Sequence, residues 1–164
     1  MVVLVMGVAG SGKTLIGSLL AERLGWRFAD ADSFHPSANI EKMSHGIPLT
    51  DADREPWLAA MRDAVAEWSA AGENAVLACS ALKRKYRDTL RRGGEVRVVY
   101  LKGSHDLIKS RLAARQGHFM KPGMLDSQFA DLEEPSEREA IVVDVDRPPE
   151  AVVEEICLQL GRCS

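Results

Sequence analysis

The stretch GVAGSGKT, residues 7–14, decides the fold of this chain because it satisfies the pattern GxxxxGK[ST] in full. The apolar run VVLVM before it, residues 2–6, has the composition of a buried strand. After it, apolar residues recur at helical spacing as far as Gly25, namely Leu15, Ile16, Leu19, Leu20 and Leu24. A phosphate-binding loop (P-loop) requires this strand–loop–helix context, so we interpret the stretch as a P-loop rather than a plain glycine turn.

The chemistry of such a loop follows from its residue types. Glycines let the backbone turn with positive φ and approach a phosphate without a Cβ in the way, while N–H groups and the following helix N-terminus supply partial positive charge. The Lys13 ammonium can reach the β- and γ-phosphates, and the Thr14 hydroxyl can bind Mg²⁺. The residues predicted to bind nucleotide are Gly7, Val8, Ala9, Gly10, Ser11, Gly12, Lys13 and Thr14.

Outside this stretch, short apolar runs alternate with helical patterns. Strands are predicted at residues 2–6, 75–78, 96–101 and 140–143, with a weaker one at 26–29. Besides the helix up to Gly25, helices are predicted around Trp57–Trp68, Leu107–Leu112 and Val152–Leu160. This alternation indicates an α/β fold, a five-stranded parallel sheet with helices on both faces, in a single domain over residues 1–164.

The composition limits the classes of partner and the compartment that we expect for the protein. The chain has 164 residues and a net charge of −3, which gives no general attraction to nucleic acid or to an anionic membrane. The three cysteines, Cys79, Cys157 and Cys163, are too scattered for a disulfide framework or a zinc site, so a reducing cytoplasm fits best. The opening apolar run ends in glycines after Met6, so we expect neither a signal peptide nor a membrane span there.

A pair of carboxylates follows the weak strand, in ADADSFHP, residues 29–36. The chain has no NKxD or DxxG motif, and the strand at 75–78 ends without an acidic residue, so metal and nucleophile need carboxylates from elsewhere. On extended chain Asp30 and Asp32 project to the same side, at the edge where such sheets bind ligands. We predict that Asp30 supports Mg²⁺ and that Asp32 orients and deprotonates an acceptor hydroxyl; the alternative is a solvated or helix-capping pair.

Four stretches now carry a specific resemblance: GVAGSGKT, DADSFHPSANIEKMSHGIPLTDADREPWL, CSALKRKYRDTLR and HFMKPGMLDSQFADLEEP. In this order and spacing they resemble the gluconate kinase (gluconokinase) family of small P-loop sugar-acid kinases, related in fold to shikimate and nucleoside monophosphate kinases. The resemblance implies transfer of the ATP γ-phosphate to the 6-hydroxyl of D-gluconate, with Mg²⁺, in a homodimer. The chain departs from the family pattern at Thr14, Ala31 and the GMLDSQF segment.

A sugar acid presents a carboxylate and a row of hydroxyls, so its site needs cations and hydroxyl partners. Arg54 resembles the carboxylate-binding arginine of the shikimate kinase branch, and a planar guanidinium suits that role. His35 is a candidate for a sugar hydroxyl, or else a cap of the next helix. Lys83 and Arg87, one helical turn apart, are candidates to face the substrate; the alternative is a solvated basic helix face.

The segment RLAARQGHFMKPG is interpreted as the start of a mobile lid over about residues 115–125. Arg111 and Arg115 lie four residues apart, and in related kinases lid arginines neutralise the transferring phosphoryl group. The alternative is a pair of cations placed favourably at a helix C-terminus. Adenine is expected near residues 144–149, where Arg147 can stack on the base.

Two other functions stay open from the sequence. One is a kinase of the same fold that phosphorylates shikimate or a nucleoside monophosphate. The other is a non-catalytic ATP-dependent switch, although the chain lacks the switch motifs that such a module needs.

Overall fold

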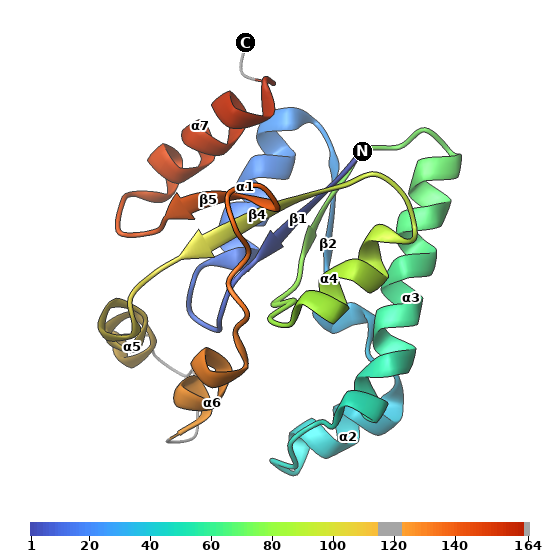
Figure 1. Cartoon of the computed structure of the whole chain (residues 1–164), viewed down its shortest axis with the longest axis vertical. Helices are drawn as coiled ribbons and strands as arrows, with labels where there is room; N and C mark the ends of the chain where they lie inside the picture. Colours follow the sequence, from blue (N-terminus) through green and yellow to red (C-terminus); the bar gives the residue numbers. More distant parts are fainter. Residues whose placement is uncertain (115–122, 163–164) are drawn as a thin grey trace.

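A computed structural model describes residues 1–114 and 123–162 of the chain, and Figure 1 shows their arrangement. Five parallel strands form one sheet in the order β2-β3-β1-β4-β5. Their bounds are β1 Val2–Met6, β2 Arg27–Asp30, β3 Ala75–Ala78, β4 Val96–Lys102 and β5 Ala140–Asp144. The predicted parallel α/β sheet is therefore confirmed, including its weak strand after Trp26.

Helices cover both faces of this sheet. Helices α1 (Lys13–Leu24) and α7 (Pro149–Leu160) pack together on one face, and α3 (Asp51–Ala70) and α4 (Arg84–Arg91) lie on the other (Figure 1). The remaining helices gather beyond the carboxyl ends of the strands, and they are the 3₁₀ helix η1 Ala31–Phe34, α2 Ser37–Ser44, α5 His105–Ala114 and α6 Met124–Asp131. Among the helices of the described ranges, none is long and apolar enough to cross a membrane.

The core divides in two because successive strand residues point to opposite faces of the sheet. Val3 and Val5 of β1 pack with Leu20 of α1 and Ile156 of α7. On the other face, the alternate residues of β1 pack with Met61 and Val65 of α3. All five residues of β1 are buried, as expected for a central parallel strand covered on both sides.

The strand register brings three chain segments to one edge of the sheet. Val5 of β1 lies opposite Ala78 of β3, and Asp30 at the end of β2 lies opposite the same Ala78. Beyond the strands, the Gly7 N–H donates to the carbonyl of Ser80 at 3.4 Å. The segments that follow β1, β2 and β3 therefore begin side by side.

Helix α4 holds the only buried arginine of the described residues, Arg87, whose side chain is 1% exposed. Its guanidinium donates to the carboxylate of Glu139 at 2.7 Å and to the carbonyls of Ala81, Leu82 and Glu133. The expectation that Arg87 faces the substrate beside Lys83 is wrong. Lys83 precedes the first turn of α4 as its N-cap, and Arg87 points inward to join α4 to the chain before β5.

We expect Arg87→Ala to lower the free energy of unfolding by about 3–5 kcal/mol, because it removes the donor of the Ala81 and Glu133 carbonyls and leaves the Glu139 carboxylate with only the longer contacts of Arg91. Urea denaturation followed by circular dichroism measures this change. The matched control is Arg84→Ala on the exposed side of the same helix, which is expected to change stability by less than about 0.5 kcal/mol. Equal losses in the two variants would contradict the structural role of Arg87.

The same contact predicts a pH dependence. Burial alone would raise the pKa of Glu139, but hydrogen bonds and charges from Arg87 and Arg91 outweigh it and leave the pKa lowered. A carboxyl whose pKa is lower in the folded state stabilises the protein fully above its unfolded pKa, about 4.3. This contribution is lost as the pH falls through the lowered folded value, so the stability gap between the wild type and Arg87→Ala should narrow in acid.

Candidate active site

The P-loop connects β1 to α1, and two of its glycines are required by its geometry. Gly10 and Gly12 have φ of 81° and 94°, in the left-handed region that residues with a Cβ rarely adopt. A Cβ at Gly10 would also lie 2.8 Å from Cγ of Leu112 on α5, closer than atoms pack. The Lys13 ammonium donates to the carbonyl of Val8 at 3.1 Å, so the side chain folds back over the loop.

The P-loop forms one wall of a cavity of about 300 Å³, which we call the phosphate cavity. The ends of β2 and β3, the segments that follow them, and one residue each of α3 and α6 form the other walls. Its lining residues are Ala9, Gly10, Gly12, Lys13, Thr14, Asp30, Ala31, Asp32, Trp57, Ala78, Cys79, Ser80 and Gln128. The structure therefore brings the two predicted aspartates and the P-loop into one cavity.

The backbone conformation that places the two aspartates at this cavity differs from the one expected. Their chain is not extended, because η1 begins at Ala31 and turns the backbone directly after Asp30. The Asp30 carboxylate causes the turn: Oδ1 accepts the N–H of Asp32 at 3.0 Å, while Oδ2 accepts the hydroxyl of Thr14 at 2.9 Å. Asp30 is thus both the helix cap of the alternative interpretation and a partner of the P-loop, whereas Asp32 lines the cavity.

The donor set suits a magnesium ion. The Thr14 hydroxyl and the Asp30 carboxylate place oxygen atoms together, and Mg²⁺ prefers oxygen ligands. Within residues 1–114 and 123–162, no three His, Cys, Asp or Glu side chains gather as a metal site of their own. Magnesium at phosphate sites needs only one or two protein ligands, since water and the phosphates supply the rest.

A second cavity of about 370 Å³ adjoins the first, and we call it the side cavity. Trp57, Ser80 and Gln128 line both cavities. The other residues of its wall are Met43, Gly46, Ile47, Pro48, Leu49, Arg54, Leu82, Tyr86, Met124, Ser127 and Asp131. A group bound at the P-loop and a molecule in the side cavity would therefore meet along a shared wall.

Arg54 is the cation of the side cavity. It lies inside the first turn of α3, which starts at a capping box between Thr50 and Asp53. Its guanidinium donates to the hydroxyl of Tyr86 at 3.3 Å and lies 3.8 Å from Asp51. Since the hydroxyl of Tyr86 in turn donates to Asp51, the arginine is held mainly through a neutral group and keeps donors for an anion.

The Asp51 carboxylate pairs with the other nearby cations, Lys83 and Lys85. Hydrogen bonds from Lys85 and Tyr86 hold the pKa of its carboxyl well below the usual range. The ammonium of Lys83 lies 3.4 Å from the same carboxylate. The structure thus places Lys83 beside Asp51 rather than in the wall of either cavity, and its role toward a substrate stays a prediction.

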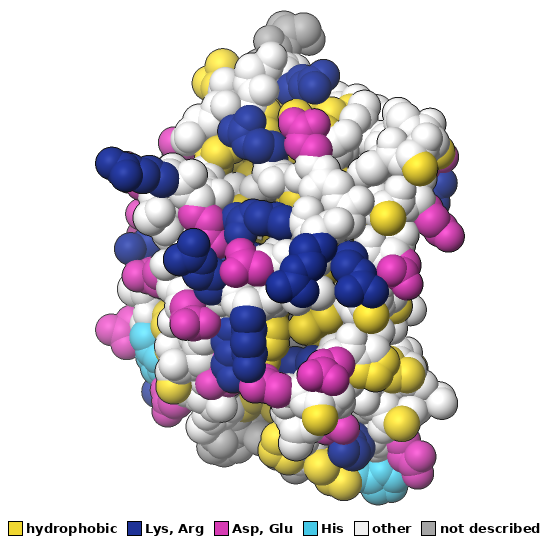
Figure 2. All heavy atoms as spheres, turned by 45° about the vertical axis from the view of Figure 1, so that its right-hand side comes forward, with side chains coloured by type: hydrophobic (Ala, Val, Ile, Leu, Met, Phe, Trp, Pro, Cys, Tyr) yellow, Lys and Arg dark blue, Asp and Glu magenta, His cyan; other side chains and the backbone are white. Residues whose placement is uncertain are grey.

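The basic run of α4 is otherwise a solvated face. Figure 2 shows basic and acidic side chains interspersed on the face formed by α3 and α4. Arg91, for example, lies 3.2 Å from Asp88, and Lys85 lies 2.6 Å from Asp51. Mixed charges of this kind are typical of a solvated surface, and the absence of a nucleic-acid partner stays a prediction.

His35 packs against Trp57 and is not among the residues that line the two cavities. Its ring stacks on Trp57 with 4.5 Å between ring centroids and an angle of 7°, and Nδ1 lies 3.2 Å from the amide nitrogen of Asn39. Burial lowers the pKa of His35; the charge of Asp32 raises it in part, and that of Arg54 lowers it. A direct contact of His35 with a sugar hydroxyl stays a prediction.

The structure does not bring Arg111 or Arg147 into the phosphate cavity. Arg111 donates from Nη2 to the carbonyl of Val145, because α5 packs beside the loop after β5. Arg147 pairs with Glu155 of α7 and lines a separate surface hollow. The contact of Arg111 with the transferring phosphoryl group on closure of the lid and the stacking of Arg147 on adenine both stay predictions. Arg115 and most of the predicted lid lie outside the described residues.

Sequence reasoning missed Gln128 and the pairing of Tyr86 with Asp51. A signal for Gln128 existed: Leu125 and Phe129 of α6, with Leu132 just after it, pack against the core, and Gln128 falls on the same helical face. A polar residue within an inward stripe needs a partner there. The pairing of Tyr86 with Asp51 joins residues 35 positions apart and left no comparable signal.

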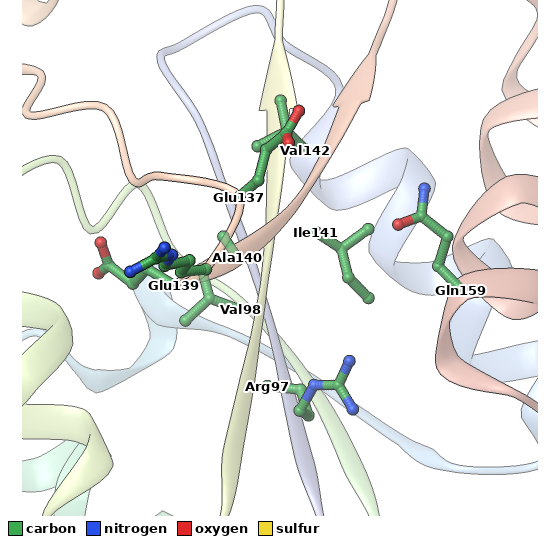
Figure 3. Close-up of a pocket in the computed structure, with 9 residues that line it drawn as sticks. Arg97, Val98, Glu137, Glu139, Ala140, Ile141, Val142 and Gln159 are labelled. Atoms are coloured by element: carbon green, nitrogen blue, oxygen red, sulfur yellow. The ribbon is translucent and has the colours of Figure 1, made fainter.

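A larger cavity, about 480 Å³, lies along β5, away from the P-loop. Its polar side chains diverge: Glu137, Glu139 and Arg97 point in different directions around the strand, with Gln159 on the far side (Figure 3). Ligand sites have convergent polar groups, so size alone does not make this cavity the active site.

A phosphate-binding loop at the edge of a parallel sheet, with carboxylates and a second cavity beside it, defines a P-loop kinase. The family model for shikimate kinase matches residues 9–160. The thermoresistant gluconokinase of Escherichia coli K12 is 49% identical over 151 residues, covering 90% of this chain and 86% of that protein.

Solved structures of related kinases have the same fold. A gluconokinase from Sinorhizobium meliloti 1021 superposes with a TM-score of 0.86 at 45% identity, over 98% of this chain and 91% of that one. An unliganded sugar kinase from Janibacter sp. HTCC2649 gives a TM-score of 0.91 at 44% identity, over 99% and 95%. The chain belongs to the gluconokinase family, within the shikimate kinase family, and ATP is the co-substrate of such kinases.

The surroundings of His35 generate a test that needs no substrate. We expect its pKa, measured by NMR titration, to lie below that of an ordinary histidine. Asp32→Asn should lower the pKa further because it removes a nearby negative charge, whereas Arg54→Gln should raise it. Asp63→Asn, at an exposed carboxylate of α3, should leave it unchanged. Shifts in the reverse directions would show that His35 does not lie between these two charges.

Proposed function

We propose that the protein transfers the γ-phosphoryl group of ATP to the 6-hydroxyl of D-gluconate, giving 6-phosphogluconate. The observation that carries the proposal is the shared wall between the phosphate cavity and the side cavity that contains Arg54. The gluconokinases among its relatives supply the identity of the acceptor.

In this proposal the P-loop holds the nucleotide. Its backbone N–H groups and the N-terminus of α1 bind the phosphates, and Lys13 leaves the carbonyl of Val8 for the β- and γ-phosphates. Thr14 and Asp30 hold Mg²⁺, which neutralises phosphate charge when it is bound. Arg115 is the cation proposed to reach the transferring group from the lid.

Asp32 acts on the acceptor. Its carboxylate accepts a hydrogen bond from the hydroxyl and takes the proton as the oxygen bonds to phosphorus. The bond between that phosphorus and ADP breaks in the same transfer, so ADP leaves with the electron pair. Asp32 suits this role because it lines the phosphate cavity while Asp30 is already bonded to Thr14.

Arg54 binds the gluconate carboxylate in the side cavity. Its guanidinium is held by the Tyr86 hydroxyl, and its remaining N–H donors match a planar carboxylate. The family resemblance extends the proposal to a homodimer in the cytoplasm.

A panel of acceptors tests the proposal directly. We expect ADP release with Mg-ATP and D-gluconate, and little with shikimate, other sugar acids or nucleoside monophosphates. Removal of Mg²⁺ by EDTA should abolish turnover, and added Mg²⁺ should restore it. Release with a different acceptor would overturn the substrate but keep the kinase, whereas ATP binding without any turnover would favour a non-catalytic switch.

Two substitutions test the assigned roles. Lys13→Ala and Asp32→Asn are each expected to lower kcat by about 10²–10⁴-fold, since each removes an interaction needed in the transition state. Circular dichroism should show an unchanged fold. Asp63→Asn makes the same chemical change as Asp32→Asn at an exposed position of α3, and it should keep full activity. Unchanged turnover in Asp32→Asn would remove Asp32 from the mechanism.

A further inference from the structure

The three residues that line both cavities are held in different ways. Trp57 is fixed by a hydrogen bond from Nε1 to the carbonyl of Ala31 and by its stacking on His35. Ser80 follows β3, and its carbonyl accepts the N–H of Gly7. Gln128 is the member of this shared wall that comes from α6, a helix far from the P-loop in sequence.

Gln128 bonds directly to the P-loop. Its Oε1 accepts the backbone N–H of Ala9 at 2.6 Å, across 119 positions of sequence. Since the N–H can only donate, the atom that faces it must be the amide oxygen rather than the nitrogen. This hydrogen bond joins α6 to the loop that binds the phosphates.

Helix α6 also forms much of the side cavity. Met124, Ser127 and Asp131 of this helix line it together with Gln128. Elsewhere, Leu125 and Phe129 pack into the core, Asp126 contacts His105, and just beyond the helix the N–H of Glu133 donates to the carbonyl of Leu82 at 2.8 Å. Among the described residues, the hydrogen bond of Gln128 joins α6 to the P-loop. It therefore sets the distance between the α6 wall of the side cavity and the phosphate-binding loop.

Resting on the function proposed above, we infer that Gln128 is a positioning residue that sets the distance between the acceptor and the γ-phosphate. Phosphoryl transfer depends mostly on positioning, and an acceptor displaced by about 1 Å loses much of its rate. When the acceptor sits too far away, water competes for the same phosphoryl group. Gln128 thus directs ATP toward the sugar acid rather than toward hydrolysis.

The test measures ADP and phosphogluconate in the same reaction, with Mg-ATP and D-gluconate. In the wild type we expect close to one phosphogluconate per ADP. Gln128→Met, which keeps the length of the side chain but cannot accept the N–H, should release ADP in excess of product and raise KM for gluconate about tenfold. Gln128→Asn, which keeps the amide but is one methylene shorter, should behave like Gln128→Met.

Gln128→Glu distinguishes loss of the hydrogen bond to Ala9 from general damage to the site. A carboxylate still accepts the N–H of Ala9, so the ratio of product to ADP should return close to one even though its charge slows turnover beside the phosphates. The matched control is Gln159→Met on α7, which should leave the ratio and KM unchanged. Thermal midpoints measured for every variant exclude a loss of folded protein as the cause.

The outcomes separate this inference from the proposed function. A wild type that turns over gluconate, with Gln128→Met and Gln128→Asn both keeping the one-to-one ratio and the wild-type KM, would overturn the role of Gln128 alone. A Gln128→Glu variant as uncoupled as Gln128→Met would also overturn it. A wild type without gluconate turnover would overturn the proposed function, and this inference with it.

Discussion

The parallel pairing of β1 with β3 and β4 is the constraint on which the site depends. It places the carboxyl ends of the central strands at one edge of the sheet, where the P-loop, Asp30 and Ser80 come together. Both faces of β1 are buried, so a slip of one residue in register would exchange the side chains that pack into the two cores. The chemical groups of the site lie on loops, but the sheet determines where those loops begin.

Hydrogen bonds to neutral groups shape the electrostatics of the site as much as ion pairs do. Tyr86 accepts from Arg54 and donates to Asp51, which connects a cation and an anion without a close ion pair. Asp51 binds Lys85 instead. Arg87, by contrast, is satisfied by carbonyls and Glu139 in the interior and contributes stability only. These two helical arginines thus serve different purposes, according to which partners surround the guanidinium.

The sequence predicted the five strands and helices α1, α3, α5 and α7 because each carries its own local signal, from the apolar run of β1 to Gly161 after α7. It also predicted that Asp30 and Thr14 serve one site. It failed at Arg87, because the Glu139 carboxylate that holds its side chain is distant in sequence. The turn at Ala31 escaped prediction because an aspartate at the end of a strand suits both an extended chain and a cap.

The contacts of the P-loop have a thermodynamic consequence. The loop is held from several sides, by Leu112 against Gly10, by Gln128 on the N–H of Ala9 and by Ser80 on the N–H of Gly7. A loop ordered in this way has little conformational entropy left to lose when a ligand arrives. The enthalpy of the phosphate contacts is then largely available as affinity, and nucleotide association need not wait for the loop to rearrange.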